Sequence, residues 1–198
     1  FMAKADFKNV EVNQDVEAQD AKFHSDLLFN NSTARLNFSL HSCLLEGKTD
    51  FGHRSVGRSV LLNNVKLGPQ HGFRFVNSSI AAILFDRETV EGHVYPEHEN
   101  NYAMAAKEYG FLRTAFQKIN RFDDEDWAYY QFKRLERKGK PLSFRPLKLI
   151  ARGVDYFFLD LGCGYGTKPF RTLGMCALVV ALFACAYFAH YGAVALPE

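Results

Sequence analysis

The sequence predicts a mainly β fold, a β-solenoid, which leads into an αα-hairpin, an interfacial amphipathic helix and one transmembrane α-helix. Three observations support this prediction. Residues 1–96 carry apolar side chains at a spacing of five, residues 97–140 show two amphipathic helical patterns, and residues 172–198 contain a long apolar stretch. With a basic segment at 141–171, the chain divides into four predicted domains.

The β prediction for residues 1–96 rests on a five-residue repeat. On its longest lattice seven of eight positions are apolar, about twice the number expected by chance. This lattice consists of Val60, Val65, Gln70, Phe75, Ile80, Phe85, Val90 and Tyr95. A second lattice consists of Phe23, Leu28, Thr33, Phe38 and Cys43. The same residues leave open an irregular antiparallel β-domain, in which short strands are separated by polar turns.

Three short segments carry a family resemblance. ADF at 5–7, AKF at 21–23 and ARL at 34–36 resemble parts of the A-(D/N)-L-x-x unit of pentapeptide-repeat proteins. The resemblance implies a right-handed quadrilateral β-helix, with each five-residue unit on one side and with the central Leu or Phe pointing inward. The repeat is degenerate, because other residues occupy positions expected to hold Ala. These are Asp26, Asn31, Arg54 and Glu88.

The segment after Pro96 predicts two helices. Residues 100–120 place apolar side chains at i, i+3 and i+4 spacing, which is typical of an amphipathic helix. Arg121 and Phe122 form a short break, and the acidic run 123–126 supplies N-cap and first-turn carboxylates for a second helix. We interpret the pair as an αα-hairpin that closes the solenoid. A docking surface for a partner protein is the alternative.

Basic residues are concentrated just before the apolar stretch. Between positions 133 and 152, eight Lys and Arg residues are opposed only by Glu136. Anionic headgroups attract such cations, so we expect contact with a membrane surface and an interfacial amphipathic helix over 147–161. The residues predicted to contact anionic lipid are Lys133, Arg134, Arg137, Lys138, Lys140, Arg145, Lys148, Arg152, Lys168 and Arg171.

The C-terminal stretch predicts a membrane span. Residues 173–196 are long enough to cross a hydrocarbon core of about 30 Å, and residues 172–197 contain no Asp, Glu, Lys or Arg. Because Lys168 and Arg171 precede the stretch, the positive-inside rule places the N-terminal body in the cytoplasm and the C-terminus on the other side. The N-terminal residues contain no apolar region typical of a secretory signal, and we expect the bacterial cytoplasmic (inner) membrane.

Three residues near the end of the span are candidate interfacial anchors: Tyr187, His190 and Tyr191. His190 is the only ionisable side chain of basic or acidic type in the stretch, and intramembrane ionisable groups are candidates for function. Its spacing from Ala186 is similar to that in light-harvesting polypeptides, so ligation of a pigment or haem is an alternative to anchoring.

Two glycine-rich motifs overlap immediately before the predicted span, and each resembles a different family. FLDLGCGYG at 158–166 resembles the first motif of S-adenosylmethionine methyltransferases, but the apolar stretch that follows leaves no room for the later strands and acidic residue of that fold. GYGTKPFR at 164–171 resembles the G-Y-G-x-x-P-x-R element before the first membrane helix of bacterial pentapeptide-repeat membrane proteins, several of which resemble ion channels. Residues 127–137 are similar to the hairpin helix of those proteins. We therefore expect no enzyme.

The composition of the chain excludes several further classes of function. A net charge of +2 is too balanced for a dedicated nucleic-acid-binding protein, and the four cysteines form no C-x-x-C pair, so neither zinc nor a disulfide framework is indicated. His and Glu residues cluster at 93–99, where a solvated loop is favoured over a metal site. We expect no cofactor and no small-molecule substrate.

These observations favour a non-enzymatic, membrane-anchored accessory or scaffold subunit. Its partners are expected to be the lipid bilayer and other membrane protein subunits, bound through the solenoid and the transmembrane helix. The alternative is the N-terminal cytoplasmic part and first transmembrane helix of a potassium-type pentapeptide-repeat channel subunit. A pore requires a re-entrant filter and a second helix, which this sequence does not contain.

Overall fold

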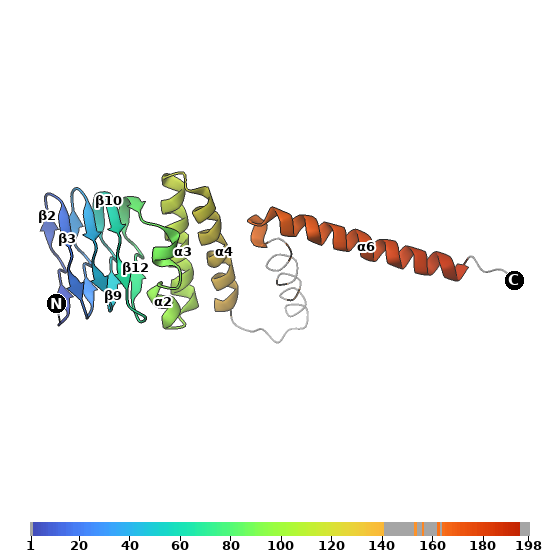
Figure 1. Cartoon of the computed structure of the whole chain (residues 1–198), viewed down its shortest axis with the longest axis horizontal. Coiled ribbons are helices and arrows are strands. Elements are labelled where there is room, and N and C mark those ends of the chain that lie inside the picture. The colour runs from blue at the N-terminus through green and yellow to red at the C-terminus, as the bar shows by residue number, and fades with distance from the viewer. Residues whose placement is uncertain (1, 141–152, 154–155, 157–161, 163, 195–198) are drawn as a thin grey trace. The chain divides into compact units, whose positions relative to one another are not determined.

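The computed structural model describes residues 2–140, 153, 156, 162 and 164–194. The chain divides into two units, Phe1–Lys140 and Pro141–Glu198, and each is described by itself. In Figure 1 the strands of the first unit are stacked from the blue N-terminal end to a green end that is covered by helices.

Thirteen short strands form the first part of this unit. They are β1 (Ala5–Asp6), β2 (Glu11–Val12), β3 (Val16–Gln19), β4 (Lys22–Phe23), β5 (Leu27–Leu28), β6 (Thr33–Ala34), β7 (Phe38–His41), β8 (Leu44–Leu45), β9 (Lys48–Asp50), β10 (Ser55–Asn63), β11 (Lys66–Leu67), β12 (Gly72–Arg74) and β13 (Ser79–Leu84). The helices that follow are α1 (Arg87–Val90), α2 (Tyr95–His98), α3 (Tyr102–Lys118) and α4 (Phe122–Gly139).

The strands build a β-solenoid of about four turns. Every strand pair among the described residues is parallel, which excludes the antiparallel alternative. Ala5 pairs with Leu27, and Leu27 pairs with Thr49. One turn therefore advances the chain by 22 positions, the same separation that the hydrogen bond from Lys48 to Asp26 spans.

This register is two positions longer than four units of the expected five-residue lattice. Strands β1 to β8 begin alternately six and five positions apart, for example at Ala5, Glu11 and Val16. The extra residue of each half turn adopts positive φ, a conformation in which Asn, Asp and His are the most common residues after glycine. These corner residues recur every 11 positions: Asn9, Asp20, Asn31, Ser42, His53 and Asn64. The five-residue lattice consequently drifts, and its member Gln70 is exposed.

A ladder of phenylalanine rings runs through the interior of the solenoid. Phe7 stacks on Phe29, Phe29 on Phe51 and Phe51 on Phe75, with ring centroids 5.1, 6.0 and 5.4 Å apart. Because these residues occupy equivalent positions in successive turns, each turn buries one ring against the next. Offset and stacked aromatic pairs add about 0.5–1.5 kcal/mol beyond the burial of their area.

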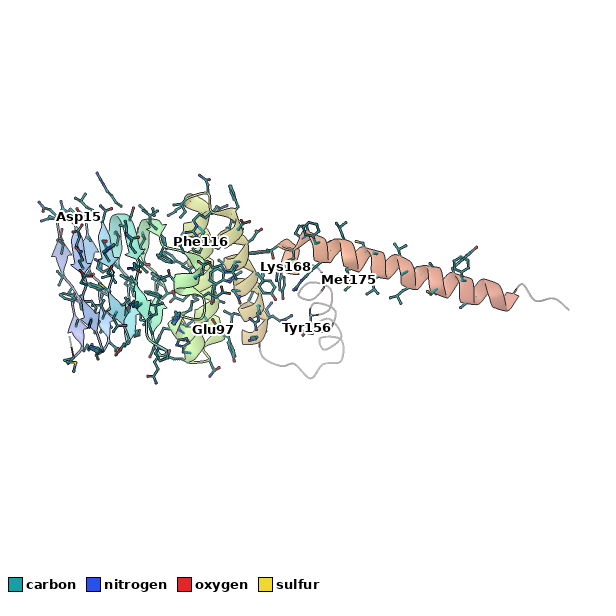
Figure 2. All side chains as sticks on the ribbon, in the orientation of Figure 1. Asp15, Glu97, Phe116, Tyr156, Lys168 and Met175 are labelled. Atoms are coloured by element: carbon teal, nitrogen blue, oxygen red, sulfur yellow. The ribbon has the colours of Figure 1, made fainter. Side chains whose placement is uncertain are left out.

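Helices close the last turn of the solenoid. α3 packs against β13 and α2 against β12, while α3 and α4 pack against each other. Leu112, Ala115 and Phe116 of α3 are buried in the same core as the solenoid residues. Figure 2 shows Phe116 within this helical part of the unit. We call α3 and α4 together the helical cap.

The start of α4 differs in one detail from the expectation. Its N-cap is Arg121, which makes no capping hydrogen bond, and Asp123, Asp124 and Glu125 lie in the first turn. The helix begins at Phe122, inside the expected break, and the Arg121 side chain is engaged in ion pairs instead of capping. It forms ion pairs with Asp124 at 2.6 Å and Asp86 at 3.3 Å.

The second unit contains a short turn, η2 (Gly164–Gly166), followed by α6 (Pro169–Val194). Residues Pro169–His190 of α6 are long and apolar enough to cross a membrane, with a mean hydropathy of 2.2. The helix begins at Pro169, ahead of the expected stretch, because proline is well suited to the first helical position. The expected interfacial helix at 147–161 lies outside the described residues apart from Gly153 and Tyr156.

Candidate functional site

The basic residues at the end of α4 have partners within their own unit. Lys133 and Lys140 lie 3.1 and 3.9 Å from the carboxylate of Glu136. The Lys138 ammonium lies 5.6 Å from the centroid of the Tyr102 ring, and Arg134 donates a hydrogen bond to Gln131 at 3.4 Å. Lys138 and Lys140 also lie at the C-terminal end of α4, where the helix dipole favours positive charge.

The remaining predicted lipid contacts are divided by what the structure describes. Arg145, Lys148 and Arg152 lie outside the described residues. Lys168 and Arg171 lie at the start of α6, and Arg171 is exposed. The prediction that these residues contact anionic lipid therefore stays a prediction.

The candidate anchors lie toward the end of α6. The Tyr187 side chain is 59% exposed, and its ring meets that of Phe188 edge-on. His190 is exposed as well, and the Tyr191 side chain lies outside the described residues. Figure 2 shows side chains projecting from both sides of α6. Anchoring, or ligation of a pigment by His190, stays a prediction.

A left-handed turn precedes α6. Gly164, Tyr165 and Gly166 all have positive φ, at 54, 55 and 88°. The turn is held by Thr167, whose hydroxyl donates to the Gly164 carbonyl at 2.7 Å. A side chain at Gly164 would be strained by its φ and would lie 3.1 Å from Cγ of Lys168. The residues that resembled a methyltransferase motif thus end in a tight turn that leads directly into an apolar helix.

The His and Glu residues at 93–99 are engaged separately. His93 Nδ1 lies 3.1 Å from the His71 carbonyl, His98 Nε2 lies 2.8 Å from the Gly92 carbonyl, and Glu97 accepts from the Tyr109 hydroxyl at 3.0 Å. Among the described residues, no group of three or more such side chains is placed to hold a metal ion. The expected loop is partly helical, because α2 begins at Tyr95 with a proline in its first turn.

Glu108 is a buried carboxylate that the sequence analysis did not single out. It lies on α3, fully buried, and accepts backbone N–H groups of Phe75 at 2.7 Å and Val76 at 3.2 Å. Burial raises its pKa to about 7, although these hydrogen bonds and Arg74 act in the opposite direction. The helical cap thereby satisfies donors that the last turn of the solenoid would otherwise leave unpaired.

His71 lies at an insertion in the solenoid. Lys66 pairs with Leu44, 22 positions earlier, which is the regular length of a turn. Phe73 pairs with Thr49, 24 positions earlier, so this turn is two residues longer. The two extra residues therefore fall between β11 and β12. His71 is fully buried there, with Nε2 3.0 Å from the Thr49 hydroxyl, and burial lowers its pKa to about 3. It is consequently neutral at physiological pH.

Arg54 is the third buried polar group that the sequence did not assign to a site. It is 2% exposed, and its guanidinium carbon lies 4.2 Å from the centroid of the Phe38 ring and 4.7 Å from that of Phe29. The sequence analysis noted Arg54 only as a residue that departs from the expected five-residue repeat. The 11-residue spacing would have placed it in the solenoid interior, since Ser32 and Cys43 precede it at that spacing and are buried.

Comparisons with known proteins do not name a family. No family model matches the chain, and no curated protein or solved structure matches it significantly. The geometry alone therefore carries the functional argument.

Proposed function

We propose that the protein is a non-enzymatic, membrane-anchored accessory or scaffold subunit, which binds other membrane proteins through its solenoid and its transmembrane helix. The observation that carries this proposal is α6. Its apolar side chains are exposed over a length sufficient for a membrane, for example Val180 at 67% and Phe183 at 74%. A bilayer removes this surface from water, and a solenoid in the same chain offers long lateral faces for binding partners.

The orientation follows from charge. Lys168 and Arg171 precede α6, so we place the solenoid in the cytoplasm and the C-terminus across the bacterial inner membrane. The cations at the end of α4 would contact anionic headgroups, each contributing about 1 kcal/mol near the surface. Pairing of Lys133 and Lys140 with Glu136 reduces this attraction for those two cations.

The solenoid is also proposed to be a diverged relative of the quadrilateral pentapeptide type. Four short strands in each of the first two turns, β1 to β4 and β5 to β8, support this kinship, whereas a turn two positions longer than four five-residue units departs from it. The second candidate function, the cytoplasmic part and first membrane helix of a channel subunit, is favoured by the left-handed turn at 164–166. This turn precedes α6 in the order G-Y-G-x-x-P that the channel-like proteins share.

Membrane insertion is tested by introducing charge into α6 of the full chain. Leu178→Lys with Leu182→Lys places two ammonium groups in the apolar stretch, at about 2.5–3.5 kcal/mol each near the bilayer centre. The matched control is Leu84→Lys with Phe122→Lys, at exposed apolar positions of the first unit. We expect the first variant to leave the carbonate-resistant membrane fraction and the control to remain in it. Equal behaviour of the two would contradict the anchor.

Surface contact is tested by amide hydrogen exchange of the full chain in vesicles. Protection of residues 133–140 should increase when neutral vesicles are replaced by vesicles that contain phosphatidylglycerol. Lys133→Gln with Lys138→Gln should abolish the increase, and Lys22→Gln with Lys66→Gln in the solenoid should preserve it. An increase that survives the first pair would exclude these cations as the lipid contact.

The accessory and channel functions are separated by native composition. Protein extracted in mild detergent is analysed by native mass spectrometry and by identification of co-migrating chains. Different membrane proteins in fixed stoichiometry support the accessory subunit. A homo-oligomer of a longer chain supports the channel and excludes the accessory function.

A further inference from the structure

The N-terminal end of the solenoid, formed by β1 to β4, has an unpaired strand edge. On one face of this end, β2 pairs only with β6 and β3 only with β7 among the described residues. Val16 donates its N–H to the Asn37 carbonyl in the next turn. Because successive residues of a strand direct their backbone groups toward opposite neighbours, the N–H and C=O groups of Glu17 and Gln19 face away from that turn. We call the outer side of β2 and β3 the open edge.

Apolar side chains lie on the inner side of the open edge. Val12 and Val16 line a cavity together with Phe7 and Val10. Phe7 and Val10 are 39% and 40% exposed, whereas Phe29, which follows Phe7 by one turn, is 6% exposed. A strand added to the open edge would bury this surface beneath its own inward-facing side chains. Every second residue of such a strand is therefore expected to be apolar.

Acidic side chains lie on the outer side of the open edge. Residues 11–20 contain four Asp and Glu residues and no Lys or Arg. Of these, Glu11 and Glu17 are exposed in β2 and β3. No Asp or Glu occurs in the segments that continue this face in the later turns, which are 33–42, 55–64 and 79–84. Negative charge on this face is thus confined to the open edge.

This charge discriminates between two classes of occupant. A second copy joined edge to edge would bring the acidic side chains of both edges together, and like charges across a strand pair are destabilising. A strand with Lys or Arg at its outward positions would place opposite charges there instead. Glu11 already lies 3.1 Å from Arg35, so Glu17 is the principal counter-charge for such a strand.

We propose that the open edge binds, by strand addition, an extended segment of a partner membrane protein in which apolar residues alternate with Lys or Arg. This inference rests on the proposed function, because it names the surface through which the solenoid binds another membrane protein. Cytoplasmic segments next to membrane helices carry an excess of Lys and Arg, so they supply the charge that the open edge attracts. Hydrogen bonds to the backbone of Glu17 and Gln19 provide affinity, and the two rows of side chains select the sequence.

The length of the bound segment follows from β10. This strand has nine residues, Ser55–Asn63, and pairs with β6 and with β7 on the same face. Because β6 and β7 pair in turn with β2 and β3, a segment of the same length spans the open edge.

The first test measures binding of fluorescent nine-residue peptides to the full chain in a neutral detergent, by fluorescence anisotropy. In the first peptide valine alternates with lysine. A second has the same composition with the residues in pairs, and a third has glutamate in place of lysine. We expect saturable binding of the first, binding about tenfold weaker for the second because its two side-chain rows no longer match, and none for the third. Equal binding of the first two, or no binding of the first, would overturn the proposal.

Matched variants locate the binding surface. Glu11→Lys with Glu17→Lys reverses the charge of the open edge and should weaken binding of the alternating peptide about tenfold. Glu88→Lys with Glu99→Lys changes the net charge equally at exposed positions outside this face and should leave binding unchanged. Equal losses in the two variants would exclude the open edge as the site. Sedimentation of the wild type without peptide should show no self-association that the first variant abolishes, since such association would assign the open edge to a second copy.

A direct measurement uses only the wild-type chain. The alternating peptide should slow amide hydrogen exchange at Glu17 and Gln19, and should leave Val16 unchanged because its N–H is already bonded to the Asn37 carbonyl. Binding without this protection would overturn strand addition. The charge test of α6 is independent of these results. A membrane-anchored chain that binds no peptide contradicts this inference alone, whereas a chain that binds the peptide but fails the test of α6 contradicts the proposed function alone.

Discussion

The two ends of the solenoid are closed in different ways. At the C-terminal end, Glu108 accepts N–H groups of the last turn, and Arg121 donates to the Phe85 carbonyl at 2.7 Å. At the other end, where Figure 2 labels Asp15, strands β1 to β4 have a paired neighbour on one side only among the described residues. There Phe7 remains 39% exposed. An apolar cap is thus insufficient by itself, because a solenoid end also presents backbone groups that need partners.

The largest expected difference between the ends concerns the phenylalanine ladder. Phe75 is 1% exposed and stacks on Phe51, Phe73, Phe85 and Phe111. Phe75→Ala should therefore lower the free energy of unfolding by about 3–5 kcal/mol. Phe7→Ala, at the exposed end of the same ladder, should cost about 1 kcal/mol, since less area is lost. Urea unfolding of the full chain measures both, and equal losses would contradict the described difference between the ends.

The next effect is a pH dependence at the capped end. The native pKa of Glu108 is about 7, above its ordinary value of 4.5, so the native state binds more protons than the unfolded state between these values. The stability of the wild type should therefore fall as pH rises from about 4.5 to about 7, by on the order of 3 kcal/mol from this group.

Glu108→Gln isolates this contribution, because glutamine does not titrate. As pH rises over that range, the free energy of unfolding of the wild type should fall relative to that of the variant. His71, whose low native pKa acts in the opposite direction, is present in both chains and cancels. A difference that stays constant from pH 4.5 to 7.5 would contradict the raised pKa of Glu108. Glu88→Gln, at an exposed position, should show no comparable change.

A smaller effect is expected at the N-terminus of α3, the first helix of the helical cap. The Asn101 side chain accepts the N–H of Met104 at 3.2 Å and so caps the N-terminus of α3. Asn101→Ala should cost about 1 kcal/mol, and Asn101→Asp should restore most of it, because aspartate also caps. Thermal unfolding provides the measurement. A loss that aspartate does not restore would indicate that Asn101 acts other than by capping.

The smallest effect is expected at an exposed ion pair near the open end. Arg35 and Glu11 lie 3.1 Å apart, and their side chains are 63% and 62% exposed. Arg35→Gln should change the free energy of unfolding by less than about 0.5 kcal/mol, because water and salt screen the pair. A double-mutant cycle with Glu11→Gln checks this, and a coupling above about 1 kcal/mol would show that surface charge stabilises this end.

The sequence by itself determined the order of parts. Short apolar steps predicted β structure before position 96, helical spacing predicted α3, and the uncharged stretch predicted α6. These signals are local, because each depends on residues that are neighbours in one element. The β-solenoid and the apolar helix are confirmed, whereas function, partners and membrane topology stay predictions.

Only the tertiary structure decided the length of a solenoid turn and the roles of the buried polar residues. The register of the turns depends on left-handed corners such as Asn31, and the regular spacing of these corners is hidden by varied side chains. Glu108 reads as one polar residue on an amphipathic helix until packing places it against the N–H groups of Phe75 and Val76. In the sequence, Arg54 is only a departure from the five-residue repeat, whereas in the structure it is buried in the solenoid interior. In each case the physical meaning of the residue is set by groups far away in the chain, which no local pattern can specify.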